Sequence, residues 1–229
     1  DNGVYMNQVI SIGKQDFASL REGNYFFVDK THFISEWWES GDDITLIARP
    51  RRFGKTLNMS MLNCFFSHQY AERADLFEGL SVWEKEDYRA IQGKYPVIFL
   101  SFADVKQDNY RDAIYKIKKI IANVYQQFHE IGRSEALTEV QRRQFMNVTA
   151  DMDDVIAQSA LQDLSYYCYL YYGRKAIILL DEYDTPMQEA YIHDYWDKFT
   201  SFVRGLFNST FKTNPYLERA LMMGITRIS

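Results

Sequence analysis

Residues 49–56, with the sequence RPRRFGKT, combine three residue types that bind phosphate groups. Gly54 has no side chain and lets the backbone approach a phosphate, and Lys55 offers a mobile positive charge. The hydroxyl of Thr56 is a ligand that Mg²⁺ accepts in phosphate-binding proteins. A helix is expected directly after this segment. The first N–H groups of that helix and the positive end of its dipole would also attract an anion. The pattern therefore predicts a phosphate-binding loop.

The segment departs from the usual GxxxxGK[ST] pattern at its first position, where Arg49 stands in place of glycine. Pro50 donates no N–H, so the early part of the loop offers fewer hydrogen-bond donors. Arg51 and Arg52 add positive charge beside the loop. Taken alone, the segment could also be a basic turn before an ordinary amphipathic helix.

A second motif lies at residues 176–182, where the apolar run AIILL is followed by Asp181 and Glu182. A carboxylate at the end of such a strand can hold the Mg²⁺ of a bound nucleotide, and we assign this role to Asp181. A neighbouring carboxylate can position or activate the attacking water, which is the role predicted for Glu182. Many strands simply end in polar residues. The two motifs together are nevertheless a rare coincidence, and they favour nucleotide binding.

Apolar runs and helical spacing predict an α/β fold with a mainly parallel sheet covered on both faces, because strands and helices alternate. The expected strands are Ile44–Ala48, Pro96–Phe102, Lys175–Leu180 and Leu221–Ile225. The expected helices are Asp16–Arg21, one that Thr31 caps, Thr56–His68, Asn109–Ile131, Glu135–Phe145, Asp151–Tyr172, one that Thr185 caps with Gln188 as its reciprocal partner, and Tyr195–Phe211.

Composition narrows the function classes. The net charge of −5 argues against a generally basic surface for nucleic acid. The two cysteines, Cys64 and Cys168, form no metal-binding or disulfide pattern, so a reducing, cytoplasmic location is expected. No apolar run approaches the roughly 20 residues of a membrane-spanning helix, and no membrane partner is expected.

With these motifs in place, the sequence resembles the AAA-ATPase-like family of bacterial and archaeal proteins, in which a restriction-endonuclease-like nuclease domain often follows the ATPase part. The matching segments are DFASLR at 16–21, YFFVDKT at 25–31, ARPRRFGKT at 48–56, LFEGL at 76–80, ILLDEYDTP at 178–186 and GITRIS at 224–229. The missing first glycine is typical of this family. The resemblance implies a P-loop NTPase fold, a three-layer αβα sandwich, with Mg²⁺ and ATP as ligands.

We expect residues 1–43 to form an N-terminal extension packed on the ATPase core, and residues 44–229 to form the P-loop domain. The long separation of Lys55 from Asp181 predicts a helical insertion between the two motif strands. Because the chain stops just after a strand end, a C-terminal part is expected to follow in a longer protein. Any nuclease activity, and any nucleic-acid partner, would belong to that part.

The predicted site residues fall into three groups. Those expected to act in catalysis are Glu182, Lys55 and Arg227; those expected to bind the nucleotide are Arg51, Arg52, Phe53, Gly54, Lys55, Thr56 and Leu57; those expected to hold Mg²⁺ are Thr56 and Asp181. Arg227 follows the last strand, where a polar group could face the terminal phosphate, although a plain exposed strand end fits equally well. Asp184 is expected to form the turn ahead of Thr185.

Three functions follow from these residues. The leading one is ATP binding and hydrolysis that drives a conformational change in a larger protein. The second is a nucleotide-dependent switch with negligible turnover, which the altered first loop position suggests. The third is a phosphotransferase with a similar loop. The absence of an NKxD motif, which reads guanine, favours ATP over GTP. Association into a homo-oligomer is left open by the sequence.

Overall fold

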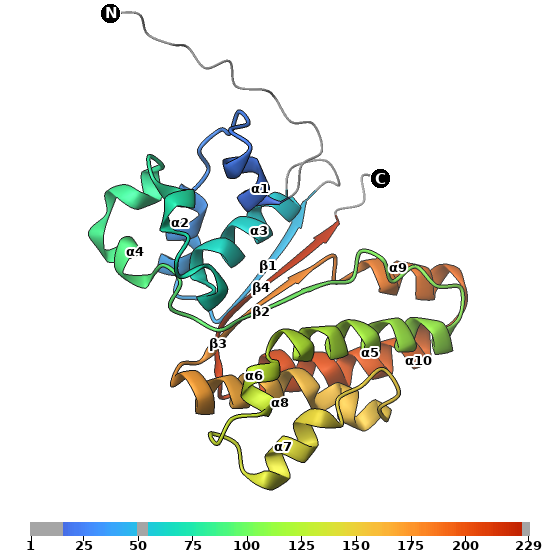
Figure 1. Cartoon of the computed structure of the whole chain (residues 1–229). Helices are drawn as coiled ribbons and strands as arrows, with labels where there is room; N and C mark the ends of the chain where they lie inside the picture. Colours follow the sequence, from blue (N-terminus) through green and yellow to red (C-terminus); the bar gives the residue numbers. More distant parts are fainter. Residues whose placement is uncertain (1–15, 50–54, 226–229) are drawn as a thin grey trace, which may run out of the picture. The chain divides into compact units, whose positions relative to one another are not determined.

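A computed structural model describes residues 16–49 and 55–225, with the side chains of Arg49, Lys55 and Thr56 outside the description. Contacts divide the chain into two compact units (Figure 1). The helical unit consists of Asp1–Gly41 and Arg52–Lys94, and the sheet unit consists of Asp42–Arg51 and Tyr95–Ser229. Each unit has its own architecture and is described by itself.

Short helices around an aromatic core make up the helical unit. Its helices are α1 (Phe17–Glu22), α2 (His32–Glu39), α3 (Lys55–Phe66) and α4 (Glu86–Ile91), joined by the 3₁₀ turns η1 (His68–Tyr70), η2 (Ala74–Phe77) and η3 (Ser81–Glu84). Phe77 stacks on Phe17 at 5.1 Å between ring centroids, and Phe65 meets Phe77 edge-on at 5.1 Å. Such offset and edge-on pairs are the favoured aromatic geometries, so they fix how α1 and α3 pack.

Thr31 lies at the predicted N-cap position of α2, but its side chain makes no cap hydrogen bond. Its buried hydroxyl donates instead to a carboxylate oxygen of Asp29 at 2.6 Å and accepts the N–H of Val82 at 3.1 Å. Asp29 also accepts the N–H of Ser81 at 2.7 Å. Although burial opposes the charged carboxylate, these hydrogen bonds hold the pKa of Asp29 below its usual range. Thr31 therefore connects the start of α2 to η3 instead of capping the helix.

In the sheet unit, four parallel strands lie in the order β1-β4-β3-β2. They are β1 (Ile44–Arg49), β2 (Val97–Ser101), β3 (Ala176–Asp181) and β4 (Leu217–Ile225). The prediction of a mainly parallel sheet is confirmed. Every residue of β3 is buried, as expected of a strand inside a parallel sheet. Strand β4 begins four residues earlier than predicted, because Leu217 and Arg219 already pair with Ala176 and Ile177 of β3, with a register shift between the two pairs.

The helices of the sheet unit lie between β2 and β3 and between β3 and β4 in the sequence. They are α5 (Tyr110–Gln127), α6 (His129–Gly132), α7 (Glu139–Met146), α8 (Asp154–Tyr172), α9 (Thr185–Ile192) and α10 (Trp196–Phe207), with a π-helical turn η4 (Asn208–Lys212) after α10. Helices α5, α8 and α10 run side by side (Figure 1). Their apolar faces share one core with alternate residues of the strands, among them Ile98, Ile178 and Leu180.

Three of the predicted helix bounds differ from the structure by four residues. The helix expected to reach Ile131 ends at Gln127, and α6 forms a separate turn after Phe128. Helix α7 begins at Glu139 because Thr138 and Gln141 form a capping box. The last helix ends at Phe207, after which the backbone widens into the π-helical turn. Within residues 16–49 and 55–225, we find no helix with the length and apolar character needed to span a membrane.

Candidate functional site

The carboxyl ends of β1, β4 and β3 lie next to one another at one edge of the sheet. Arg49, the last residue of β1, pairs with Ile225 of β4, and Met223 of β4 pairs with Asp181 at the end of β3. Because adjacent strands lie about 4.8 Å apart, the ends of β1 and β3 are about 10 Å apart across β4. In open parallel sheets, ligands bind outside this edge.

Asp181 is the last residue of β3 and is 2 % exposed. One of its carboxylate oxygens accepts the N–H of Glu182 at 2.9 Å, and its carbonyl accepts the N–H of Phe102 at 3.0 Å. The carboxylate is therefore oriented by the backbone of its own turn. A buried, oriented carboxylate at a strand end is well suited to hold a cation.

Glu182 turns the chain away from the sheet. Its φ of +50° lies in the left-handed region, which non-glycine residues rarely adopt. Its half-buried carboxylate accepts the hydroxyl of Thr185 at 3.0 Å. Backbone strain of this kind persists where the surroundings hold it in place, and it is concentrated at functional sites. Glu182 is thus aimed by its backbone and by the first residue of α9.

The prediction that Thr185 caps α9 is wrong. Helix α9 begins at Thr185 with Pro186 in its first turn, and Asp184 occupies the N-cap position without a side-chain cap bond. Thr185 uses its hydroxyl for Glu182 rather than for the backbone N–H near Gln188. The carboxylate of Asp184 accepts the N–H of Ile225, at 3.0 Å to its nearer oxygen. Asp184 therefore does more than form a turn, because it connects the end of β4 to the segment after β3.

Sequence reasoning missed Gly224 and Tyr183 as parts of this edge. A Cβ on Gly224 would lie 2.7 Å from Cε1 of the Tyr183 ring and 3.1 Å from Cγ of Asp184. The N–H of Tyr183 donates to the carbonyl of Met223 at 3.2 Å. Burial, together with the charge of Asp184, raises the pKa of Tyr183 above its usual value. A glycine one residue before a strand end was the one signal that could have indicated this close approach.

Strand β1 ends at Arg49 and helix α3 begins at Lys55, as the predicted strand–loop–helix requires. Lys55 and Thr56 form the first turn of α3, and Leu57, also expected to bind nucleotide, is partly exposed on the same helix. The other predicted loop residues, Arg51, Arg52, Phe53 and Gly54, lie outside the described residues, as does Arg227. Of the predicted set, the structure describes the side chains of Leu57, Asp181 and Glu182.

Metal-binding clusters were sought among the histidine, cysteine and acidic side chains. Within the described ranges, no three of them come together as ligands.

These features define an α/β protein whose parallel sheet presents an oriented pair of carboxylates at its carboxyl edge. The chain belongs to the family described as "Predicted AAA-ATPase", which it matches over residues 11–229. It is 27 % identical over 222 residues to a protein of Azotobacter chroococcum mcd 1 described as "Uncharacterized protein in vnfD 5'region". That match covers 96 % of this chain and 38 % of the relative. No solved structure matches the chain.

Proposed function

We propose that the carboxyl edge of the sheet binds ATP with Mg²⁺ and hydrolyses it, and that the chain is the ATPase part of a longer protein. Membership in the predicted AAA-ATPase family supports the class of activity. The relative is longer than this chain, so the work that hydrolysis drives would be done by other parts of such a protein.

The strand order is the single observation that carries this proposal. The strand that leads into RPRRFGKT and the strand that ends in Asp181 and Glu182 both flank β4 and end at the same edge. Only five residues separate Arg49 from Lys55, so the start of α3 follows closely after the end of β1 in the chain. We therefore propose that a triphosphate held by this loop also reaches the two carboxylates.

Each residue has a role that matches its chemistry. The N–H groups of residues 51–57 and the positive end of α3 would bind the phosphates, and Lys55 would bridge the terminal ones. Thr56 and Asp181 would hold Mg²⁺, which neutralises charge on the phosphates. Glu182 would orient the attacking water, and Arg51, Arg52 and Arg227 are the cations available to stabilise the transferred group.

The donor set fits Mg²⁺. A carboxylate that is 2 % exposed and fixed by the Glu182 N–H is a hard oxygen ligand that loses little freedom on binding a cation. The same burial keeps bulk water away from the ligand oxygens and strengthens their attraction for the ion.

Direct binding tests the proposal. The wild-type chain should bind fluorescent ATP in the presence of Mg²⁺ and release ADP without any acceptor. Lys55→Ala should remove most of this affinity, whereas Lys94→Ala, a change at an exposed lysine, should leave it intact. Equal affinity of Lys55→Ala and wild type would contradict the proposed site. ADP release that depends on an added acceptor would indicate a phosphotransferase.

One observation favours a switch with negligible turnover as the second candidate. An oxygen of Glu182 already accepts a hydrogen bond from Thr185, so this oxygen is engaged by the protein itself. In a pure switch, ATP would bind with Lys55-dependent affinity, and the wild type would release ADP no faster than the Lys55→Ala variant.

A further inference from the structure

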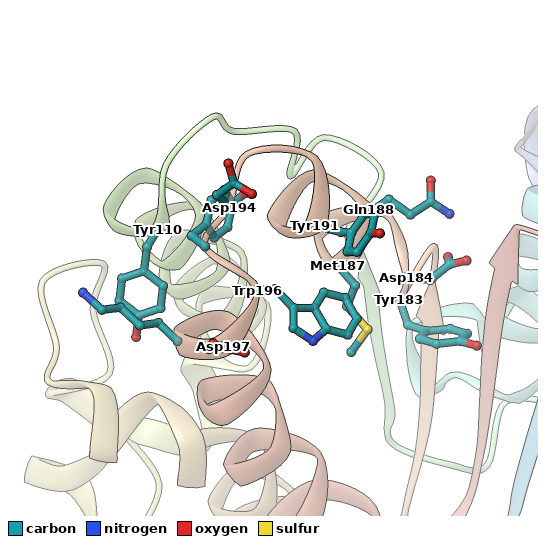
Figure 2. Close-up of a pocket in the computed structure, with 11 residues that line it drawn as sticks. Tyr110, Tyr183, Asp184, Met187, Gln188, Tyr191, Asp194, Trp196 and Asp197 are labelled. Atoms are coloured by element: carbon teal, nitrogen blue, oxygen red, sulfur yellow. The ribbon is translucent and has the colours of Figure 1, made fainter.

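A large pocket lies beside α9, lined by residues of several elements of the sheet unit. Its volume is about 1110 Å³, and its walls come from the starts of α5 and α10, from α9 and from the segment after β3. Figure 2 shows Trp196 and Met187 between Tyr110 at one end and Tyr183 at the other. A second hollow of about 480 Å³ shares Tyr110, Asp197 and Lys198 with it, so the two adjoin, and together we call them the groove.

Aromatic rings form the apolar part of the groove. Trp196 is 43 % exposed and Tyr191 is 68 % exposed, and they meet edge-on at 6.1 Å between ring centroids. Tyr195, also in the lining, is buried, and its hydroxyl donates to the carbonyl of Gln107 at 2.7 Å. The groove thus offers two accessible rings, as do sites that stack flat or cationic groups.

The charges in the groove are mainly negative. Asp194 and Asp197 are exposed on its wall, and across the described residues neither carboxylate has an ion pair. Asp184 lies at the far end, and Lys198 is the one basic residue of the lining. Burial and nearby carboxylates raise the pKa of Tyr110 and of Tyr195, and the carboxylates make the surroundings more negative.

We propose that this groove binds an arginine-containing peptide segment of a partner protein. Carboxylates can pair with a guanidinium group through two parallel hydrogen bonds, and the faces of Trp196 and Tyr191 can stack on it. The volumes of the two hollows, about 1110 Å³ and about 480 Å³, together exceed the usual size of a small-molecule pocket and suit a peptide segment. The same negative charge repels phosphate groups, so a nucleic acid is disfavoured although its bases could stack on the rings.

Calorimetric titration of the wild-type chain with the peptide acetyl-Arg-Leu-Arg-Leu-Arg-amide tests this proposal. We expect saturable binding that weakens as salt is added. The double variant Asp194→Asn with Asp197→Asn should bind at least about tenfold more weakly, because it loses charge-assisted hydrogen bonds. Asparagine also tolerates the left-handed backbone of residue 194, whose φ is +61°, so the variant should keep the fold.

Matched controls separate a specific groove from general attraction between charges. The variant Glu135→Gln with Asp151→Asn changes the net charge equally at exposed positions outside the groove, and its affinity for the peptide should equal that of the wild type. Trp196→Ala should also weaken binding, and circular dichroism would verify that each variant is folded. Equal weakening in both double variants, or no binding by the wild type, would overturn the proposal. So would competition by the oligonucleotide (dT)₈ for the same site.

Discussion

The acidic end of β3 and the groove beside α9 are close together in the sequence, yet their carboxylates differ: those at the end of β3 are hydrogen-bonded, and those in the groove are exposed. At the end of β3, the carboxylates of Asp181, Glu182 and Asp184 each accept a hydrogen bond from a backbone N–H or a hydroxyl of their own unit. In the groove, Asp194 and Asp197 lie exposed beside aromatic rings. The first arrangement fixes positions as phosphate chemistry requires, and the second leaves side chains able to adapt to a partner.

The largest difference between the two regions should appear in ATP turnover. Glu182→Gln is expected to reduce turnover by roughly 10²–10⁴-fold while ATP affinity stays the same, because the group that orients water is lost. The groove variant Asp194→Asn with Asp197→Asn should leave turnover without peptide unchanged. Steady-state ADP release and ATP titration measure both quantities. If the groove variant lost turnover as strongly as Glu182→Gln, the claim that the groove carboxylates take no part in ATP turnover would be wrong.

Stability should also differ between the two sets of carboxylates. Asp184→Ala leaves the N–H of Ile225 without its acceptor and should lower the free energy of unfolding by about 1–3 kcal/mol. Asp151→Ala, at an exposed aspartate, should change it by less than about 0.5 kcal/mol. Urea unfolding followed by circular dichroism gives both values. Equal values for the two variants would mean that Asp184 does not secure the end of β4.

Gly224 provides a test of the close packing at the sheet edge. Gly224→Ala places a methyl group 2.7 Å from the Tyr183 ring, and it should cost about 1–2 kcal/mol of unfolding free energy. Combining it with Tyr183→Ala should lower the cost of the alanine at 224, which then meets only the contact with Asp184, 3.1 Å from Cγ. A double-mutant cycle in urea measures this coupling, and purely additive effects would contradict the contact.

The smallest predicted effect concerns Thr185, which links α9 to Glu182. Thr185→Val keeps the volume of this buried side chain but removes the hydroxyl that donates to Glu182. The loss of about 1 kcal/mol of positioning should slow turnover roughly fivefold, with unchanged ATP affinity. Thr185→Ser should restore the rate, since serine retains the donor. A Thr185→Val variant with faster turnover would instead mean that the hydrogen bond restrains Glu182, as in the switch.

The sequence predicts the strands and the acidic edge well, because both depend on local patterns. Apolar runs indicated the four strands that the structure describes, and their parallel direction follows from the helices between them. The early start of β4 escaped prediction because Glu218 and Arg219 are polar and because the pairing of Leu217 and Arg219 depends on β3. The role of Asp184 was missed because its partner, Ile225, is 41 positions away.

The groove could not be predicted for a related reason. All lining residues of its larger hollow except Tyr110 lie between Tyr183 and Lys198, but they belong to the segment after β3, to α9 and to the start of α10, and Tyr110 comes from the distant helix α5. The two predicted carboxylates, Asp181 for Mg²⁺ and Glu182 for catalysis, are by contrast consecutive residues at a strand end. Chemistry carried by consecutive residues can be predicted from a sequence, whereas a hollow depends on how neighbouring helices are oriented and on distant residues such as Tyr110.

A crystal structure of the chain with Mg²⁺ and a non-hydrolysable ATP analogue tests the central claim most directly. The account predicts that the triphosphate lies at the carboxyl edge of the sheet, with Lys55 on the terminal phosphates and Asp181 in the coordination sphere of the Mg²⁺. A nucleotide bound elsewhere, or one that contacts Lys55 while Asp181 and Glu182 lie beyond reach of the metal and the phosphates, would contradict it.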